Sequence, residues 1–388
     1  MAIPIQYSVR NLWLRRATTF ATLAGVALVV FVLAATLMLA AGVKRTLISA
    51  GNPERALVMQ GGSYSEGDSR MRQSVVGLVG AAPHVQVDPQ GNPLVTGETV
   101  VHVYLPSTQN ARDIASVQVR GVMGNVFSVR DEVRIVEGRL PKPGTEEGVV
   151  GLRLYRKYAG LSLGQGFGLQ KNRSVKIVGV FAANGSAYES EVWADLDAVS
   201  ASFGFQGYVS SITARLGHAQ NFDGFAAHLR ADKRLGLDVE RERAYYEKIS
   251  EGLGHLITGL GGMVVFIFSF GALLGAAITM YGAVSQRTKE LGVLKALGFS
   301  RSDVVLAILA ESTLLALLGG VLGTVLSLLT PLLDFSAMNF ATGQQLVFRF
   351  VPEPGILLTA LGSGALVGVL GGFFPALRAA SVRPCEVL

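Results

Sequence analysis

The sequence contains few residues whose types and spacing could carry chemistry. No G-x-x-x-x-G-K-[ST] loop for phosphate occurs, and neither H-E-x-x-H nor G-x-S-x-G is present. A single cysteine, Cys385, excludes a C-x-x-C motif. The histidines have no spacing typical of metal ligands: His84, His102, His218, His228 and His255. We therefore expect no catalytic site, no metal site and no bound cofactor in this chain.

The pattern between residues 287 and 303 favours contact with another protein rather than catalysis. Leu291, Leu294 and Leu297 recur at intervals of three residues, which predicts one apolar stripe on a short helix. Charged residues surround the stripe: Arg287, Lys289, Glu290 and Lys295. Such a helix can dock into a groove on a second protein. The alternative is an interfacial helix that its basic residues anchor to lipid.

Glu311 is an acidic residue inside an otherwise apolar stretch. An ionised side chain inside a membrane helix costs roughly 2.5–3.5 kcal/mol on insertion scales, so Glu311 should face protein or water. It could relay a proton or substrate, or it could make a structural contact with Ser312 or with a basic partner such as Lys295. Because we find no second buried acid or base in the apolar stretches, the sequence favours the structural contact.

Glycines recur at intervals of four residues in the apolar stretches. The pairs are Gly271 with Gly275, Gly319 with Gly323, and Gly364 with Gly368. Small residues at this spacing let helix backbones approach closely in lipid, where no hydrophobic effect drives association. Glycine is also generally frequent in membrane helices. Three pairs predict tight helix packing, either within the chain or across a dimer.

Four long apolar stretches must position these residues. The chain of 388 residues is 50% hydrophobic and only 16% charged, with a mean hydropathy of +0.42, whereas soluble domains carry about 25% charged residues. A stretch of roughly 20 apolar residues suffices to cross a bilayer. We predict transmembrane helices at 17–43, 253–286, 304–330 and 355–377. They separate an N-terminal segment (1–16), a large domain (44–252), a helical loop (287–303), a short loop (331–354) and a C-terminal tail (378–388).

Basic residues cluster on one side of the predicted spans. They precede the first stretch, lie between the second and third, and follow the fourth: Arg10, Arg15, Arg16, Arg287, Lys289, Lys295, Arg301, Arg378 and Arg383. Between the third and fourth stretches there is only Arg349. Because cytoplasmic loops carry an excess of Lys and Arg, both termini are predicted to be cytoplasmic. Residues 44–252 and 331–354 would then lie outside. The net charge of +6 thus reflects membrane topology, and we expect no nucleic-acid partner.

The large segment reads as a mixed α/β domain. Runs rich in Val and Ile and bounded by turn residues predict strands at 56–60, 99–105, 116–120, 134–137, 148–151 and 174–181. Helices are expected at 69–79, 152–159, 221–229 and 240–251. The last of these should continue into the second span as a stalk. The sequence therefore predicts a four-helix membrane protein with a mixed α/β extracytoplasmic domain.

Three segments resemble the FtsX/MacB-type ABC transporter permeases. Residues 287–326 combine a charged start, an amphipathic stretch, a Gly-Phe-Ser turn and a Glu-Ser pair inside the next span. The C-terminus reads P-A-x-x-A-A followed by P-x-E-x-L. In the large domain, V-E-G-R at 136–139, VVGLRLYRKYAGLSLGQ and SVKIVGVF are similar to the periplasmic core domain of MacB-like permeases. The resemblance covers nearly the whole chain.

This resemblance implies a permease subunit that works with partner chains. MacB carries an N-terminal ATPase domain that this sequence does not include, so we expect a stand-alone permease similar to LolC/LolE or DevC. A cytoplasmic ABC ATPase would bind ATP and Mg and would contact the 287–303 helix. A second permease copy or homologue would complete a dimer, and the resemblance allows for a periplasmic adaptor or lipoprotein. The implied location is the bacterial inner (cytoplasmic) membrane.

Two functions remain open for such a permease. It could transmit ATP-driven motion to its outer domain and extract or export a lipid, lipoprotein or peptide-like substrate. It could instead be an FtsX-like regulator that activates an extracytoplasmic partner such as a cell-wall hydrolase, without moving cargo. A secondary transporter is disfavoured because several buried ionisable residues and inverted repeats would be expected.

Overall fold

The chain divides into two compact units. The computed structural model describes residues 16–338, 343 and 345–381. A helical unit comprises residues 1–42, 255–333 and 349–388, and an α/β unit comprises residues 43–254 and 334–348.

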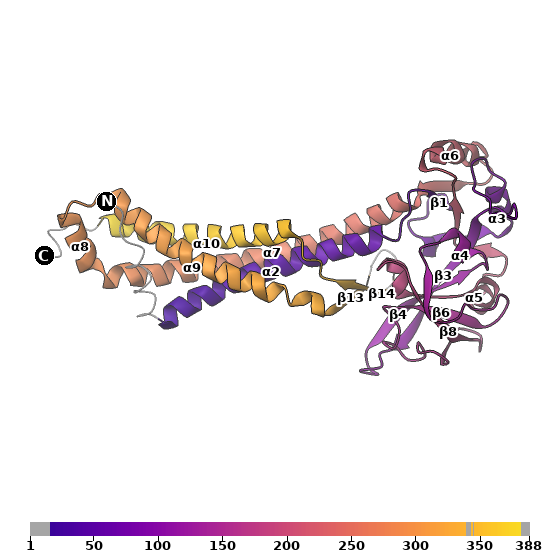
Figure 1. Cartoon of the computed structure of the whole chain (residues 1–388), viewed down its shortest axis with the longest axis horizontal. Coiled ribbons are helices and arrows are strands. Elements are labelled where there is room, and N and C mark those ends of the chain that lie inside the picture. Colours follow the sequence, from indigo (N-terminus) through magenta and orange to yellow (C-terminus); the bar gives the residue numbers. More distant parts are fainter. Residues whose placement is uncertain (1–15, 339–342, 344, 382–388) are drawn as a thin grey trace. The chain divides into compact units, whose positions relative to one another are not determined.

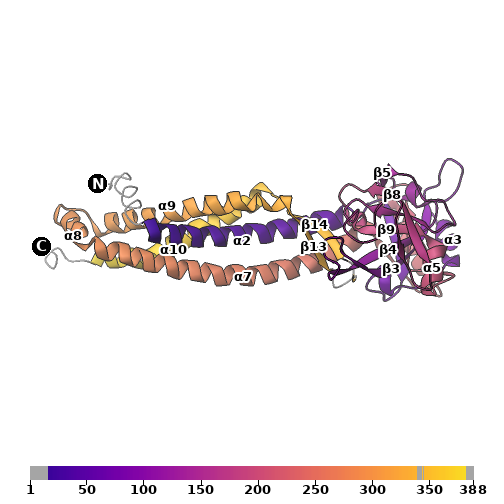
Figure 2. The ribbon, with the colours of Figure 1, turned by 90° about the horizontal axis from the view of Figure 1, so that it is seen from below.

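Four long helices form most of the described part of the helical unit. They are α2 (Arg16–Ile48), α7 (Glu242–Gln286), α9 (Arg301–Ser327) and α10 (Pro354–Ser381), and they run lengthwise beside one another (Figures 1 and 2). A short helix, α8 (Thr288–Ala296), joins α7 to α9, and a 3₁₀ turn, η4 (Thr330–Leu332), follows α9. By length and composition, each of the four long helices could cross a membrane.

Local sequence signals explain where these helices begin and end. Ser300 caps α9 and forms a capping box with Asp303. Pro331 lies in the turn η4 that follows α9. α7 is one unbroken helix of 45 residues, so the predicted stalk at 240–251 is continuous with the second apolar stretch. Pro375 lies inside α10, and the helix continues past it to Ser381.

A mixed sheet forms the framework of the α/β unit. Its ten strands follow the order β12-β1-β11-β3-β4-β9-β6-β8-β5, and β7 pairs with β8. The β4–β9 and β6–β8 pairs are parallel, and the other pairs of this sheet are antiparallel. The strands are β1 (Arg55–Gln60), β3 (Val95–Pro106), β4 (Ile114–Val122), β5 (Arg134–Gly138), β6 (Glu147–Gly151), β7 (Gly166–Gly168), β8 (Ser174–Ala182), β9 (Glu191–Asp195), β11 (Ser211–Arg215) and β12 (Leu237–Arg241).

Short helices and two small two-stranded sheets complete this unit. The helices are α3 (Ser74–Gly80), α4 (Val126–Val129), α5 (Leu196–Phe203) and α6 (Phe222–Ala231), with 3₁₀ turns η1 (Glu66–Asp68), η2 (Ala187–Ser190) and η3 (Ala219–Asn221). Strand β2 (Met71–Arg72) pairs with β10 (Tyr208–Val209), and β13 (Asp334–Met338) pairs with β14 (Gln345–Arg349).

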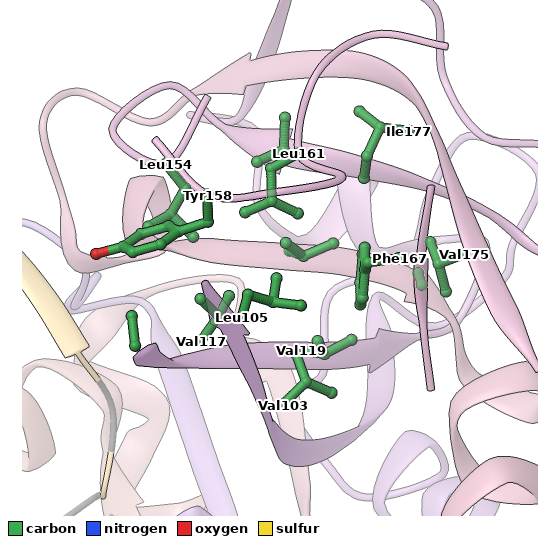
Figure 3. Close-up of a cluster of buried hydrophobic side chains, with 14 of the residues drawn as sticks. Val103, Leu105, Val117, Val119, Leu154, Tyr158, Leu161, Phe167, Val175 and Ile177 are labelled. Carbon is green, nitrogen blue, oxygen red and sulfur yellow. The ribbon is translucent and has the colours of Figure 1, made fainter. Parts of the chain in front are cut away.

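The core of the α/β unit lies against the middle of the sheet. Val103 and Leu105 of β3 and Val117 and Val119 of β4 point into a cluster with Phe167 (Figure 3). β3 is buried along most of its length, as expected for a central strand that is covered on both faces. The alternating valines of these strands therefore do form part of the hydrophobic core.

The predicted elements of the α/β unit agree in part with the structure. All six predicted strands are present, as are helices near 69–79 and 221–229. The helix predicted at 152–159 is wrong: this segment forms turns, and Arg156 has a φ of 62°, which a right-handed helix cannot contain. Strand β9 and helix α5 were not predicted.

The connection between α9 and α10 is more than the short loop that we predicted at 331–354. It contains the β13–β14 pair, and residues 334–348 belong to the α/β unit. Val347 of β14 lies in the buried core cluster, and its backbone N–H donates to Ser190 Oγ at 3.2 Å. Arg153 donates to the Val347 carbonyl oxygen. The three consecutive apolar residues of QLVFR in β14 carried this signal, but the strand is only five residues long.

Candidate functional site

The connecting helix α8 has an inner face that packs within the chain. Leu291 is buried, and Leu294 is partly buried against the ends of α7, α9 and α10. The surrounding cluster consists of Met280, Val284, Val304, Val305, Ile308, Leu309, Ala376 and Ala379. Of the three leucines of the predicted stripe, Leu291 is therefore buried within the chain and Leu294 is only partly accessible to a second protein.

The outer face of α8 is exposed and differs from the predicted stripe. Leu297 is 72% exposed and Val293 is 46% exposed. Helical geometry explains the division, because residues six apart lie about 120° from each other around the axis, so Leu297 cannot share a face with Leu291. The other exposed residues on this side are Lys289, Glu290 and Ala296. We call Lys289, Glu290, Val293, Ala296 and Leu297 the outer face of α8.

Both ends of α8 are tied to neighbouring helices. Arg287, its N-cap residue, donates from Nη1 to Glu311 Oε2 at 2.9 Å, and the side chains are 15% and 8% exposed. At the other end, Lys295 Nζ donates to the Ala380 carbonyl oxygen of α10. Glu311 thus contacts a basic residue, but the expectation of Lys295 as its partner is wrong. Lys295 instead stabilises the C-terminal end of α10, where unpaired carbonyl groups attract cations.

Two of the three glycine pairs lie at close helix contacts. A Cβ on Gly319 would lie 2.8 Å from the Leu23 carbonyl oxygen, and one on Gly323 would lie 2.3 Å from that of Ala27. On α10, a Cβ on Gly364 would meet Val30 Cγ2 at 2.8 Å. A Cβ on Gly368 would meet Ala316 Cβ at 2.4 Å. These contacts hold α2, α9 and α10 together at backbone distance.

Gly271 and Gly275 are not packed against another helix of the chain. A Cβ at either position would have no atom within 4 Å. Both glycines instead line an apolar groove of about 420 Å³ between α2 and α7. Close packing within the chain is therefore wrong for this pair, and packing across a dimer stays a prediction.

A buried ionic network runs through the α/β unit. Its arginines are at most 2% exposed, and each contacts two or more carboxylates. The chain of ion pairs is Glu132–Arg55–Glu242–Arg130–Glu98–Arg120, with Glu66 and Glu191 also paired to Arg120. These residues come from β1, β3, β4, β9, η1, the first turn of α7 and the segment after α4.

Opposite charges keep Glu242 and Arg120 ionised despite their burial. Burial alone would raise the pKa of the Glu242 carboxyl, but the charges of Arg130 and Arg55 and hydrogen bonds from Asn52 and Arg55 lower it to about 2. Burial would lower the pKa of Arg120, but Glu191, Glu66 and Glu98 raise it well above its usual value. At Glu191, by contrast, burial raises the pKa of the carboxyl despite the charge of Arg120.

Sequence reasoning missed this network, although it left a signal. Glu98 and Arg120 each interrupt an otherwise apolar or small-residue strand segment, and charged residues at such positions are almost always paired when buried. Paired residues of the network lie between 22 and 187 residues apart in the chain. No periodic pattern connects residues at such separations, so only the fold reveals which charges meet.

Two family profiles match most of the chain. The profile of the MacB-like periplasmic core domain matches residues 19–232. The profile of the FtsX-like permease C-terminal region matches residues 262–384, which includes α8, α9 and α10.

Individual relatives cover shorter parts of the chain. An ABC transporter permease of Methanocaldococcus jannaschii is 25% identical over 223 residues, which is 56% of this chain and 55% of that protein. A macrolide export ATP-binding/permease protein MacB of Yersinia pestis bv. Antiqua is 38% identical over 132 residues, 34% of this chain and 18% of that protein. The chain thus spans about half the length, or less, of these relatives.

The solved structures are similar at a lower level. The periplasmic region of MacB from Actinobacillus actinomycetemcomitans is 12% identical, with a TM-score of 0.39, over 52% of this chain and 95% of that chain. Membership rests on the two profiles, of which the first covers more than half of the sequence and the second covers the region of the connecting helix. The chain belongs to the FtsX/MacB-type ABC transporter permeases.

Proposed function

We propose that this chain is the permease subunit of a transporter whose ATP hydrolysis occurs in a separate ATPase subunit. Hydrolysis would move the helical unit and, through it, the α/β domain, for extraction or export of a lipid, lipoprotein or peptide-like substrate. The chain would lie in a bacterial inner membrane as part of a dimer, with the four long helices as spans. Both termini and α8 would be cytoplasmic.

The outer face of α8 is the observation that carries this proposal. It presents two apolar side chains, Val293 and Leu297, between the charged residues Lys289 and Glu290. An apolar pair flanked by charges fits a groove on a protein, where the apolar atoms leave water and the charges fix the register. The sequence contains no phosphate loop, so the energy for movement must come from a partner.

Two features of the chain support movement of the α/β domain. α7 is continuous from Glu242 to Gln286, so it has no flexible break at which motion would be lost. Its first residue, Glu242, is held by Arg55 and Arg130 inside the α/β unit. In this proposal, α7 is the element that would carry movement to the sheet.

The outer face of α8 can be tested by replacing Val293 and Leu297 together with aspartate. Burying each side chain at a contact contributes roughly 1.5–3 kcal/mol, so the double variant should weaken ATPase binding by about 100-fold or more. The measurement is the dissociation constant between the full permease in nanodiscs and the ATPase encoded with it. Stimulated ATP hydrolysis should be lost in parallel.

Tyr104→Asp with Ile114→Asp provides a matched control. These side chains are 74% and 66% exposed on the β3–β4 pair of the α/β unit, so the variant adds the same charge at exposed apolar side chains of the other unit. It should bind the ATPase like the parent. If the α8 variant also binds like the parent, α8 is a lipid-facing anchor and the docking proposal is wrong.

A further inference from the structure

The Arg287–Glu311 ion pair links the connecting helix to the interior of α9. Glu311 lies ten residues after the first residue of α9, at about 15 Å along the helix axis. Arg287 lies at the junction of α7 and α8, and its Nη1 is 2.9 Å from Glu311 Oε2. Both side chains are largely buried, so solvent screens the pair little.

The geometry and burial of the Arg287–Glu311 pair fix the position of the arginine relative to the carboxylate. A hydrogen bond between two charged groups is shorter and about twice as strong as one between neutral groups, and it fixes the donor relative to the acceptor. Within an apolar helix, a carboxylate has few alternative partners. Rotation of Arg287 away from Glu311 would therefore leave a buried charge without compensation.

A displacement of α9 would also displace α10, because the two helices are closely packed beside Glu311. A Cβ on Gly372 would lie 2.1 Å from Ser312 Oγ, and one on Gly368 would lie 2.4 Å from Ala316 Cβ. At this distance the two helices interlock and cannot slide without a clash. Lys295 adds a second tie, from the last turn of α8 to the Ala380 carbonyl oxygen.

We propose that the Arg287–Glu311 pair is the joint through which a displacement of α8 reaches the α9–α10 pair. Arg287 and Glu311 are then positioning residues: they touch neither nucleotide nor ATPase, and they act by holding α8 in register with α9. The inference rests on the proposed function and adds the route that force takes after docking. By this inference, α8 docks through its outer face and transmits movement through a different contact, the Arg287–Glu311 pair on the opposite side.

The test compares Arg287→Gln, Glu311→Gln and the exchanged double variant Arg287→Glu with Glu311→Arg. Each full-length permease is reconstituted in nanodiscs with the ATPase encoded beside it. Affinity for the ATPase and permease-stimulated ATP hydrolysis are both measured. We expect each single variant to bind the ATPase like the parent but to lose about tenfold in stimulation, within the usual range of coupling between sites. The exchanged variant should recover most of the stimulation.

Arg301→Gln serves as the control for charge loss, since Arg301 is an exposed arginine at the first position of the same helix. It should leave stimulation unchanged. Stimulation at the parent level in both single variants would overturn the inference. If the single variants do not fold, as judged by gel filtration and melting temperature, the exchanged variant tests the inference in their place. A folded exchanged variant that binds the ATPase without stimulating it would overturn the inference as well.

These outcomes differ from a failure of the proposed function. If the proposed function were wrong, the parent permease itself would not bind the ATPase, or the α8 outer-face variant would bind it normally. In the present test, binding is retained and only stimulation changes.

Discussion

Single charged residues have different roles here according to the partners that the fold gives them. Glu242, Glu311 and Glu147 all have the same side chain. Glu242 lies between two buried arginines, and Glu311 contacts one arginine inside the helical unit. Glu147 pairs with the half-exposed Arg139 on the surface. Surface pairs of this kind contribute little to stability, whereas breaking a buried pair leaves an uncompensated charge.

Replacing Glu242 with glutamine should destabilise the α/β unit by roughly 3–5 kcal/mol at neutral pH, because Arg55 and Arg130 would lose a buried partner. Denaturant unfolding of the full chain, followed by the fluorescence of Trp193 in a Trp13→Phe background, would measure this loss. Trp193 is buried and contacts the network through Glu191.

The same residue predicts a dependence on pH. Its folded pKa of about 2 lies below the ordinary value, so the folded state binds fewer protons than the unfolded state between these values. The stabilisation, roughly 3 kcal/mol, is complete above about pH 5 and is lost as the pH falls toward 2. The difference in stability between parent and Glu242→Gln should therefore shrink on acidification. A constant difference between pH 7 and pH 3 would contradict this assignment.

Asp232→Asn provides the control for both measurements. Asp232 pairs with Arg234, whose side chain is 90% exposed. Hydrogen bonds from Arg234 lower the pKa of the Asp232 carboxyl, whose side chain is 35% exposed to solvent. Its replacement should leave unfolding unchanged within error, since water solvates both partners once they separate.

At the level of elements, glycine pairs with the same spacing lie in two different surroundings. Gly319 and Gly323 face the backbone of α2, whereas Gly271 and Gly275 line an open groove. The sequence pattern is the same for both pairs, so it predicts that a close contact is possible but not which helix supplies it. That choice depends on how the helices pack, which the local pattern does not contain.

Replacing Gly319 and Gly323 together with leucine should therefore destabilise the helical unit. Each side chain would have to displace the α2 backbone, and overpacking of this kind costs typically 1–3 kcal/mol per site. We expect a lower melting temperature in detergent and loss of the folded monomer peak in gel filtration.

Gly271→Leu with Gly275→Leu is the matched control, because open space surrounds both positions within one chain. This variant should keep the melting temperature of the monomer. If the pair packs across a dimer, the dimer should dissociate. An unchanged dimer would place both glycines against lipid, and equal destabilisation by both double variants would contradict the packing described here.

The elements differ in how far the sequence could predict them. The four apolar helices follow from length and hydropathy, although α9 begins at Arg301, three residues before the predicted span. Strands β3 and β4 follow from their Val-rich alternation. β9 and α5 were missed because they follow each other without a turn signal. At α8, the leucine spacing identified the helix but assigned Leu294 to the wrong face, since its burial depends on the ends of three other helices.

At the scale of the whole molecule, the chain combines a helical unit with close backbone contacts and an α/β unit with a buried ionic network. Gly138 shows how a family motif serves this stability: its φ is +80°, and a Cβ there would lie 2.3 Å from the Val178 carbonyl oxygen. Glycine in the V-E-G-R segment is therefore required by the β5–β8 pairing.

The topology of the molecule is the remaining prediction, and it rests on the unequal distribution of basic residues around the apolar helices. In a Cys385→Ser background, a cysteine at Gln109 in the α/β unit should react with a membrane-impermeant maleimide in intact spheroplasts. A cysteine at Lys289 on α8 should react only after the membrane is opened. Both side chains are exposed in the structure, so burial does not limit either reaction. The unmodified protein gives a third site, because native Cys385 should resist labelling until lysis. Labelling of position 289 but not 109 in intact spheroplasts would reverse the topology and would remove α8 from the reach of any cytoplasmic ATPase.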